Sequence, residues 1–172
     1  MVRRLMGRAY VKGLSATAIA GALTIGSLAV TPAQAADDNR IRFKFRDSRS
    51  ICLTAYERSN DPLVMERCDG DNARGNWRKI IYSGGGIVML LQNVASGECL
   101  DVESGLEAKA YTSPCDVNDR GQHWYYFCDT GFIMAAASNT VLTGWNDNTV
   151  TARVGGNVLE GKQRWDRMPA VC

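Results

Sequence analysis

The side chains of this 172-residue chain that could do chemistry are six cysteines, one histidine and a set of carboxylates. The lone histidine, His123, leaves little room for a histidine-dependent catalytic triad, and no glycine-rich phosphate loop is present. Asp101 and Glu103 would share one face of a short strand, where a carboxylate pair could hydrolyse a glycosidic bond. Such pairs are frequent by chance, so we expect a protein that is not an enzyme and has no cofactor.

The cysteines are spaced regularly. Cys52 and Cys68 are separated by sixteen positions, as are Cys99 and Cys115. One histidine and no Cys-x-x-Cys pair argue against a metal site, so none is expected. An even number of cysteines behind an export signal indicates disulfides. The equal separations favour the pairs Cys52–Cys68 and Cys99–Cys115, which leaves Cys128–Cys172.

Residues 1–35 have the pattern of a secretory signal peptide. Basic residues come first, followed by the acid-free apolar run Leu14 to Val30 and the small-residue cleavage site Ala33-Gln34-Ala35. A membrane anchor is the alternative, but glycine, serine and threonine interrupt the run, whereas a membrane span needs roughly twenty strongly apolar residues. We therefore expect a secreted protein without a stable membrane anchor.

The leader also determines the sign of the net charge. It holds four of the 20 basic residues and none of the 18 acidic residues, so the remaining chain is slightly acidic. A nucleic-acid-binding surface needs clustered basic charge, so no nucleic acid is expected as a partner.

The cysteine-containing stretches belong to a longer internal repeat. Three pairs of a leucine and a tryptophan, Leu53 and Trp77, Leu100 and Trp124, and Leu142 and Trp165, have separations of 24, 24 and 23 residues. The repeats extend over approximately residues 40–85, 86–131 and 132–172. Repetition at this period indicates a chain built from repeated supersecondary units.

Each repeat is expected to consist of short strands. Residues 40–46 alternate basic and apolar side chains, as a half-buried strand does, and further apolar runs at 87–91, 125–127 and 132–135 are separated by polar turns. No segment after the leader shows a sustained helical period. One such unit cannot bury its apolar face alone, so we predict a single all-β domain, residues 36–172, with a closed pseudo-threefold arrangement.

These motifs resemble the ricin B-type (R-type) lectin β-trefoil, whose repeats carry Cys-Leu-Asp-Val, a second cysteine and Gln-x-Trp. The resemblance covers residues 40–172. Gln122-His123-Trp124 and Gln163-Arg164-Trp165 keep the last motif, whereas Gly75-Asn76-Trp77 keeps only its tryptophan. The resemblance implies a disulfide-supported β-trefoil with Trp77, Trp124 and Trp165 in its structural core.

The resemblance also implies a carbohydrate-binding site that needs a carboxylate, an aromatic face and an amide. Of the three repeats, only the second has the family's aspartate after Cys-Leu, at Asp101; Thr54 and Thr143 replace it elsewhere. Tyr111 is expected to supply the ring and Gln122 the amide.

Two positions in the second repeat depart from the family pattern. Ser113 stands where the family often has its aromatic residue, and Gly121 stands where it commonly has asparagine. Both departures are expected to weaken the site. A second contact is predicted in the third repeat, where Trp145 lies beside a polar loop that contains Asp147.

We therefore predict weak binding of glycans or polysaccharide, best in the second repeat and dependent on multivalent display. The alternative is a trefoil that binds a protein, as a protease inhibitor or a subunit of a secreted assembly does, because a fold alone does not determine function. Residues 60–64 or 155–160 would then carry the contacts.

Overall fold

The chain folds into short antiparallel strands, as the polar turn signals predict. The computed structural model describes residues 40–48, 50–69, 72–81, 87–155 and 161–169. The strands are β1 (Arg40–Phe45), β2 (Ile51–Thr54), β3 (Val64–Arg67), β4 (Trp77–Ile81), β5 (Met89–Asn93), β6 (Cys99–Val102), β7 (Glu107–Ser113), β8 (Trp124–Phe127), β9 (Phe132–Ala135), β10 (Thr140–Gly144), β11 (Val150–Val154) and β12 (Trp165–Met168). Three 3-10 turns are η1 (Ala73–Gly75), η2 (Arg120–Gln122) and η4 (Gly161–Gln163).

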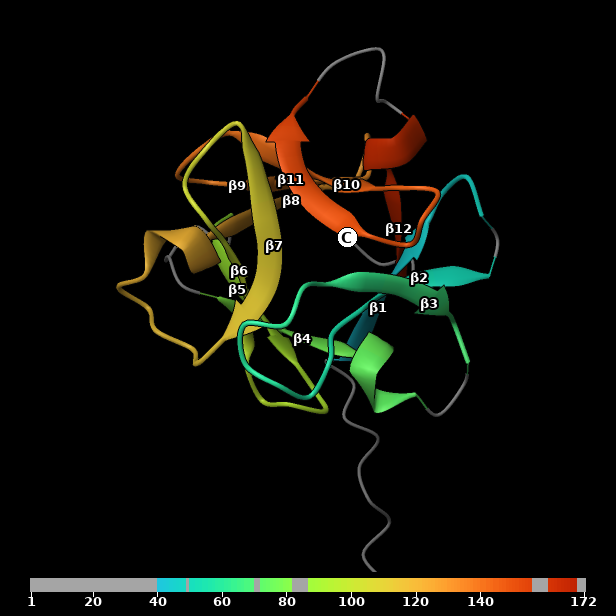
Figure 1. Ribbon diagram of the computed structural model, residues 1–172, viewed down its shortest axis with the longest axis horizontal. Coiled ribbons are helices and arrows are strands. Elements are labelled where there is room, and N and C mark those ends of the chain that lie inside the picture. Colours follow the sequence, from blue (N-terminus) through green and yellow to red (C-terminus); the bar gives the residue numbers. More distant parts are fainter. Residues whose placement is uncertain (1–39, 49, 70–71, 82–86, 156–160, 170–172) are drawn as a thin grey trace, which may run out of the picture. The chain divides into compact units, whose positions relative to one another are not determined.

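The strands form three similar four-stranded units, which together make a β-trefoil. In each unit the second and third strands pair as an outer hairpin: β2 with β3, β6 with β7, and β10 with β11. The first and fourth strands join a continuous run in the order β12, β1, β4, β5, β8 and β9. In Figure 1, β3, β7 and β11 surround the centre of the view. The predicted all-β trefoil is thus confirmed.

The alternating pattern at the start of the domain gives a strand with one buried face. Ile41, Phe43 and Phe45 on β1 are buried, while the basic residues between them are exposed or half-buried. Other predicted strands shift slightly: the run at 87–91 becomes β5, which begins at Met89 and continues to Asn93. Asn93 ends that strand opposite Trp77 of β4, and its side chain accepts hydrogen bonds from Ala95 N and Ser96 N in the following turn.

One contact recurs in each unit and explains the fixed spacing of leucine and tryptophan. The indole Nε1 of Trp77 donates to the carbonyl oxygen of Leu53 at 3.1 Å. Trp124 donates in the same way to Leu100 at 2.9 Å, and Trp165 to Leu142 at 3.0 Å. All six side chains are fully buried. Each tryptophan therefore fills the core and satisfies a buried carbonyl.

Disulfides support the loops that follow the outer hairpins of the first two units. Cys52 is bonded to Cys68, and Cys99 to Cys115, as the repeated spacing predicts. The third predicted bridge, Cys128–Cys172, includes a cysteine outside the described residues and stays a prediction.

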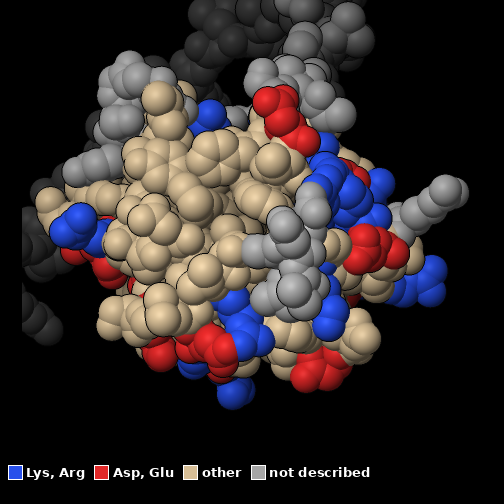
Figure 2. All heavy atoms as spheres, turned by 90° about the horizontal axis from the view of Figure 1, so that it is seen from above, with Lys and Arg blue, Asp and Glu red and all other residues tan. Residues whose placement is uncertain are grey.

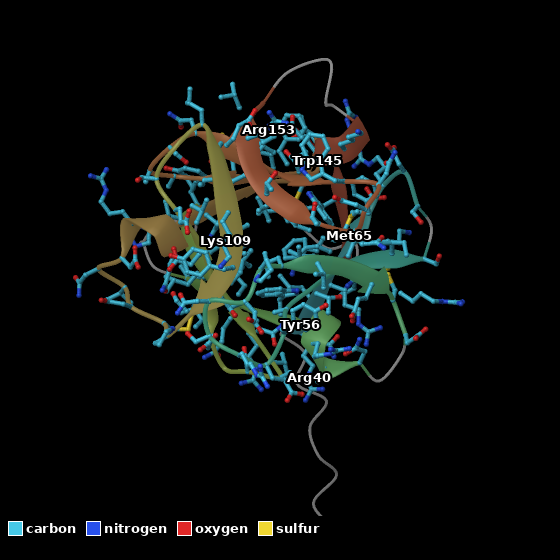
Figure 3. The ribbon with its side chains drawn as sticks, in the orientation of Figure 1. Arg40, Tyr56, Met65, Lys109, Trp145 and Arg153 are labelled. Carbon is cyan, nitrogen blue, oxygen red and sulfur yellow. A yellow bond between two sulfur atoms is a disulfide. The ribbon has the colours of Figure 1, made fainter. Side chains whose placement is uncertain are left out.

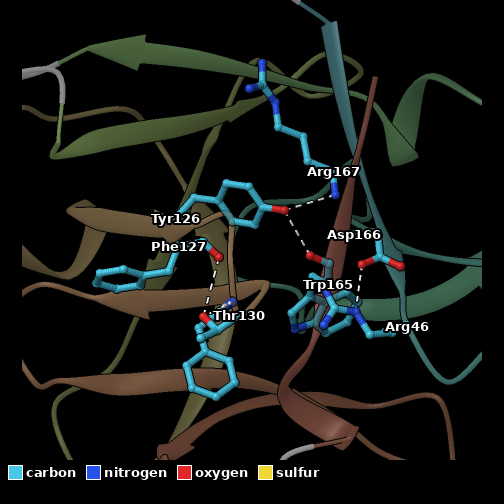
Figure 4. A network of polar contacts seen from close by, with 8 residues as sticks. Arg46, Tyr126, Phe127, Thr130, Trp165, Asp166 and Arg167 are labelled. Atoms are coloured by element: carbon cyan, nitrogen blue, oxygen red, sulfur yellow. Dashed lines mark hydrogen bonds and ion pairs between the residues drawn. The ribbon is translucent and has the colours of Figure 1, made fainter. Parts of the chain in front are cut away.

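Tyr126 ties the second unit to the third. Its hydroxyl on β8 donates to the carbonyl oxygen of Trp165 and accepts from the backbone N–H of Arg167, both at 3.1 Å on β12 (Figure 4). Burial raises the pKa of this hydroxyl above its ordinary value. Nearby, Arg46 of β1's following turn forms an ion pair with Asp166 at 2.7 Å. These contacts connect the last strand, β12, to β8 and to the turn after β1.

The predicted signal peptide, residues 1–35, lies outside the described residues. No helix in the described part of the chain is long and apolar enough to span a membrane. Figure 2 shows one face of the domain, where uncharged side chains form a broad area with basic and acidic groups interspersed along its margin.

Candidate functional site

Each unit has a cavity beside the loop that follows its second strand. The first cavity, about 470 Å³, is lined by Tyr56, Glu57, Arg58, Asp61, Pro62 and Arg74. The second, about 630 Å³, includes Asp101, Glu103, Leu106, Tyr111, Asp119 and Gly121 in its lining. The third, about 280 Å³, includes Phe45, Met65, Trp145, Asn146, Asn148 and Lys162. The cavity of the second unit is thus the largest of the three.

The first and third cavities each have a cation beside an aromatic ring in their lining. In the first, the Arg74 guanidinium lies 5.9 Å from the centre of the Tyr56 ring, and in the third the Lys162 ammonium lies 4.8 Å from the centre of the Trp145 ring. Both cations stand at the position that precedes the last residue of the 3-10 turn. The corresponding position in the second unit is Gly121, so no side chain extends there.

Asp101 on β6 supplies the carboxylate of the second cavity. Its Oδ2 accepts a hydrogen bond from the Ser113 hydroxyl at 2.6 Å, and its Oδ1 accepts one from the backbone N–H of Val102 at 2.7 Å. The residue is only 3% exposed, yet it lines the cavity. A carboxylate has about four acceptor positions, so these two bonds fix its orientation and leave it able to accept from a ligand.

Gly121 makes room for that carboxylate. A Cβ at this position would lie 2.4 Å from Asp101 Oδ1 and 2.8 Å from the carbonyl oxygen of Val102. Only glycine fits beside Asp101 in this geometry, because real Cβ contacts essentially never come that close. Gly121, where the family commonly has asparagine, thus lies directly beside the carboxylate. That this departure weakens sugar binding stays a prediction. In the aligned repeats, Arg74 and Lys162 stand at the position of Gly121. That difference is the feature of the sequence that indicates extra space beside Asp101.

Tyr111 lies directly across the hairpin from Asp101. The two residues are register partners on β6 and β7, so their side chains project on the same side of the pair. Partial burial, followed by the charge of Asp101 and a hydrogen bond with it, raises the pKa of Tyr111 to about 12. The phenol of Tyr111 therefore keeps its proton at neutral pH, and the residue lines the cavity.

Gln122 is placed behind the cavity and does not line it. The residue is 1% exposed, and its Nε2 donates to Ser113 Oγ at 2.7 Å and to the Pro114 carbonyl at 2.9 Å. Its Oε1 accepts from the backbone N–H of Asp116 at 2.9 Å. The amide of Gln122 therefore contacts Asp101 only indirectly. The Ser113 hydroxyl accepts a hydrogen bond from Gln122 and donates one to the Asp101 carboxylate.

The loop that carries Gly121 is shaped by its own sequence. Asp119 Oδ1 accepts from the backbone N–H of Gly121 at 2.9 Å and so caps η2. Asn72 caps η1 in the same way, by accepting from the N–H of Arg74 at 3.0 Å. The same backbone turn therefore presents arginine in one unit and glycine in the other.

Acidic groups predominate around the second cavity. Asp101, Glu103 and Asp119 each act electrostatically on Tyr111, whereas the lining contains one basic residue, Arg120. Among the described residues, no group of three or more histidine, cysteine, aspartate or glutamate side chains is arranged to hold a metal ion. The charge at this cavity favours a neutral ligand over an anionic one.

The two candidates in the third unit lie in different surroundings. Trp145 is half-buried, and its Nε1 donates to Thr151 Oγ1 at 2.9 Å. Asp147 is exposed and accepts from the hydroxyl and backbone N–H of Thr149. Those hydrogen bonds lower the pKa of Asp147. Asp147 therefore orders its own turn, while Trp145 lines two separate cavities.

Two loops are the predicted contacts for a protein partner. The segment 60–64 is held against the second hairpin, because Asn60 N donates to Thr112 O at 2.8 Å and Leu63 N to Ala110 O at 2.9 Å. In the other segment, residues 156–160 lie outside the described residues.

The sequence profile of the ricin-type β-trefoil lectin domain matches residues 33–124, which is more than half of the chain. The chain belongs to this family of carbohydrate-binding domains. No curated relative matches the sequence.

Several solved structures share the fold at low sequence identity. The designed threefold-symmetric protein ThreeFoil is 17% identical, with a TM-score of 0.65 over 76% of this chain and 98% of that one. The Polyporus squamosus lectin is 15% identical, with a TM-score of 0.65 over 75% and 48%. The β-trefoil lectin of the Vibrio vulnificus hemolysin/cytolysin is 15% identical, with a TM-score of 0.57 over 75% and 93%.

Proposed function

We propose that this protein is a secreted lectin whose best carbohydrate site is the cavity of the second unit. The family supports carbohydrate binding as such. This cavity is chosen because Asp101 and Gly121 lie side by side in it. Asp101 supplies a carboxylate, and Gly121 has no side chain to fill the space next to it. The other two units have threonine in place of the aspartate and a cation in place of the glycine.

In the proposed binding mode, Asp101 accepts a hydrogen bond from a sugar hydroxyl at the acceptor position that Ser113, Val102 and Tyr111 leave open. Tyr111 covers the apolar side of the ring, and the exposed Leu106 adds apolar contact at the mouth of the cavity. Gln122 acts as a positioning residue, because it holds the Ser113 hydroxyl that orients the carboxylate. Asp147 orders the turn after β10.

A site in which one carboxylate, Asp101, contacts the sugar predicts modest affinity, so effective binding relies on several copies meeting a multivalent glycan. Secretion is proposed from residues 1–35, with the mature domain at 36–172. N-terminal sequencing of the exported protein tests this boundary, since a mature chain that still begins before Ala36 would contradict it.

Probes for the site come from the similar structures. The Vibrio vulnificus domain was solved with N-acetyl-D-lactosamine, and the Polyporus squamosus lectin with Neu5Aca2-6Galb1-4GlcNAc. A glycan array followed by calorimetric titration with N-acetyllactosamine and galactose measures whether the present chain binds a neutral sugar.

The decisive variant is Asp101→Thr, because threonine is what the other two units carry at this position. We expect at least tenfold weaker binding, since charge-assisted hydrogen bonds are lost. Asp129→Thr removes the same charge from an exposed turn and serves as the matched control. Equal affinity of the wild type and Asp101→Thr for the sugar would remove the proposed site.

A further inference from the structure

A fourth cavity of about 460 Å³ lies outside the three equivalent positions. It runs between the outer hairpins of the second and third units and is called here the β7–β11 groove. Its lining includes Pro62, Glu107, Lys109, Trp145, Thr151 and Arg153. The groove is therefore made where the three units pack together, with Pro62 contributed by the first unit.

Strand pairing determines which side chains face this groove. Glu107 is opposite Arg153 and Lys109 is opposite Thr151 on the paired strands β7 and β11. These alternate residues project on one side, while Ala108 and Ala152 between them are buried.

Trp145 forms a fixed wall of the groove. Its indole N–H donates to Thr151 Oγ1, and the Arg153 guanidinium lies 5.0 Å from the ring centre. Figure 3 shows Arg153 beside Trp145. Arg153 is in turn paired with Glu107. An aromatic ring held in this way loses little conformational entropy when a sugar packs against it.

Lys109 brings an uncompensated positive charge to the groove. It is exposed, and its ammonium donates to the Asn60 carbonyl at 2.5 Å and lies 5.5 Å from the centre of the Tyr111 ring. In the described part of the chain no carboxylate pairs with it. Since Glu107 neutralises Arg153, the groove has a net positive charge, opposite to that of the second-unit cavity.

The groove and the second-unit cavity adjoin each other. Tyr111 lines the cavity, and Lys109, two residues earlier on β7, lines the groove. Residues two apart on a strand are separated by about 7 Å, which a chain of linked sugars readily bridges.

We propose that the β7–β11 groove is a second subsite that receives a negatively charged sugar unit of the same glycan. Lys109 contacts the anionic group, and the sugar lies against the edge of the Trp145 ring, because Arg153 and Lys162 lie over that ring. This inference rests on the proposed function, because the neutral unit of that glycan occupies the cavity beside Asp101. The lectin then selects glycans in which a neutral sugar is linked to a carboxylated or sulfated one.

The test compares the wild-type affinity for N-acetyllactosamine with that for its sialylated and 6-sulfated derivatives. We expect an approximately tenfold gain from the anionic group, as one charge-assisted hydrogen bond gives, and a smaller gain at high salt. The two derivatives distinguish a carboxylate from a sulfate. No gain with either derivative overturns the inference while the proposed function stands.

Variants then assign the gain to the groove. In Lys109→Gln, the sialylated or sulfated sugar should bind about as tightly as the neutral one, so the gain disappears. Lys109→Arg should keep most of the gain in affinity. Lys44→Gln removes a lysine from β1, far from the groove in sequence, and should leave the gain intact. A gain that persists in Lys109→Gln overturns the inference. Failure of the wild type to bind any neutral sugar instead contradicts the proposed function, and the inference with it.

Discussion

Asp101 and Gly121 occupy their positions as a pair: a Cβ on residue 121 would lie 2.4 Å from Asp101 Oδ1. Asp101 comes from β6 and Gly121 from the 3-10 turn before β8, so the loop must approach the strand closely. In the first and third units, threonine at the aspartate position accompanies Arg74 and Lys162 at the glycine position. The second unit therefore differs from the other two at both of these neighbouring positions.

This pairing predicts that substitutions at the two positions are not additive. Gly121→Ala should destabilise the domain by about 1–3 kcal/mol, because the added methyl group overpacks against Asp101 and the Val102 carbonyl. In an Asp101→Thr background the cost should fall, giving a coupling energy of about 0.5 kcal/mol or more. Urea unfolding of the four proteins measures this cycle, and strictly additive free energies would refute the pairing.

The ionisation of Tyr111 gives a second prediction. Burial and Asp101 raise its pKa from 10.0 to about 12, so the folded protein retains the phenol proton at a pH where the unfolded chain has lost it. The resulting stabilisation is complete below pH 10 and is lost as the pH rises towards about 12. Phenolate absorbance during a pH titration should show late-titrating tyrosines, and their number should fall by one in Tyr111→Phe.

The same titration tests the contact with Asp101. Asp101→Asn removes the negative charge that helps to raise the pKa of Tyr111 but leaves the burial, so the pKa should fall part of the way towards 10.0. An unchanged titration curve for the Asp101→Asn protein would show that the carboxylate does not act on Tyr111.

The repeated indole-to-carbonyl bond predicts similar costs in all three units. Trp77→Phe, Trp124→Phe and Trp165→Phe each leave a buried leucine carbonyl without its donor and create a cavity, at a cost of about 3 kcal/mol. Trp145→Phe, at a half-buried position, should cost about 1 kcal/mol or less. Thermal or urea unfolding measures the series, and a small loss at any one of the three core positions would contradict the shared role.

The two disulfides should differ in their effect on sugar binding. Replacing either pair by alanine should destabilise the domain by about 3 kcal/mol, because each closes a loop of similar length. Loss of Cys99–Cys115 should also weaken sugar binding, since that bridge borders the loop from Ser113 to Gln122. Loss of Cys52–Cys68 should leave the affinity nearly unchanged, and titration of both variants under folding conditions makes the comparison.

The third bridge is tested separately. Peptide mapping without reduction should recover Cys128 joined to Cys172, as the cysteine spacing predicts. Recovery of a peptide that joins Cys128 to any other cysteine would overturn that pairing.

Much of the fold could be predicted from the sequence because its determinants are local or periodic. The alternation at β1, the turn residues and the regular leucine-to-tryptophan spacing predict short strands in three repeats. Equal cysteine separations predict two of the bridges. Asp101 stands out as a candidate because the repeats can be compared with one another, and that comparison needs no coordinates.

The arrangement of the candidate site depends on contacts between segments that are distant in the sequence. The spacing of residues along the chain does not reveal these contacts. Ser113 looked like a lost aromatic residue, yet it connects Gln122 to Asp101. Gln122 is expected from the sequence to contact a ligand, but its amide forms hydrogen bonds with the Pro114 carbonyl and the backbone N–H of Asp116. The β7–β11 groove joins residues from all three units. The sequence by itself determined the repeated scaffold and the one unit with an aspartate; only tertiary packing decided which side chains meet, because contacts of a few ångströms depend on how the units fit together.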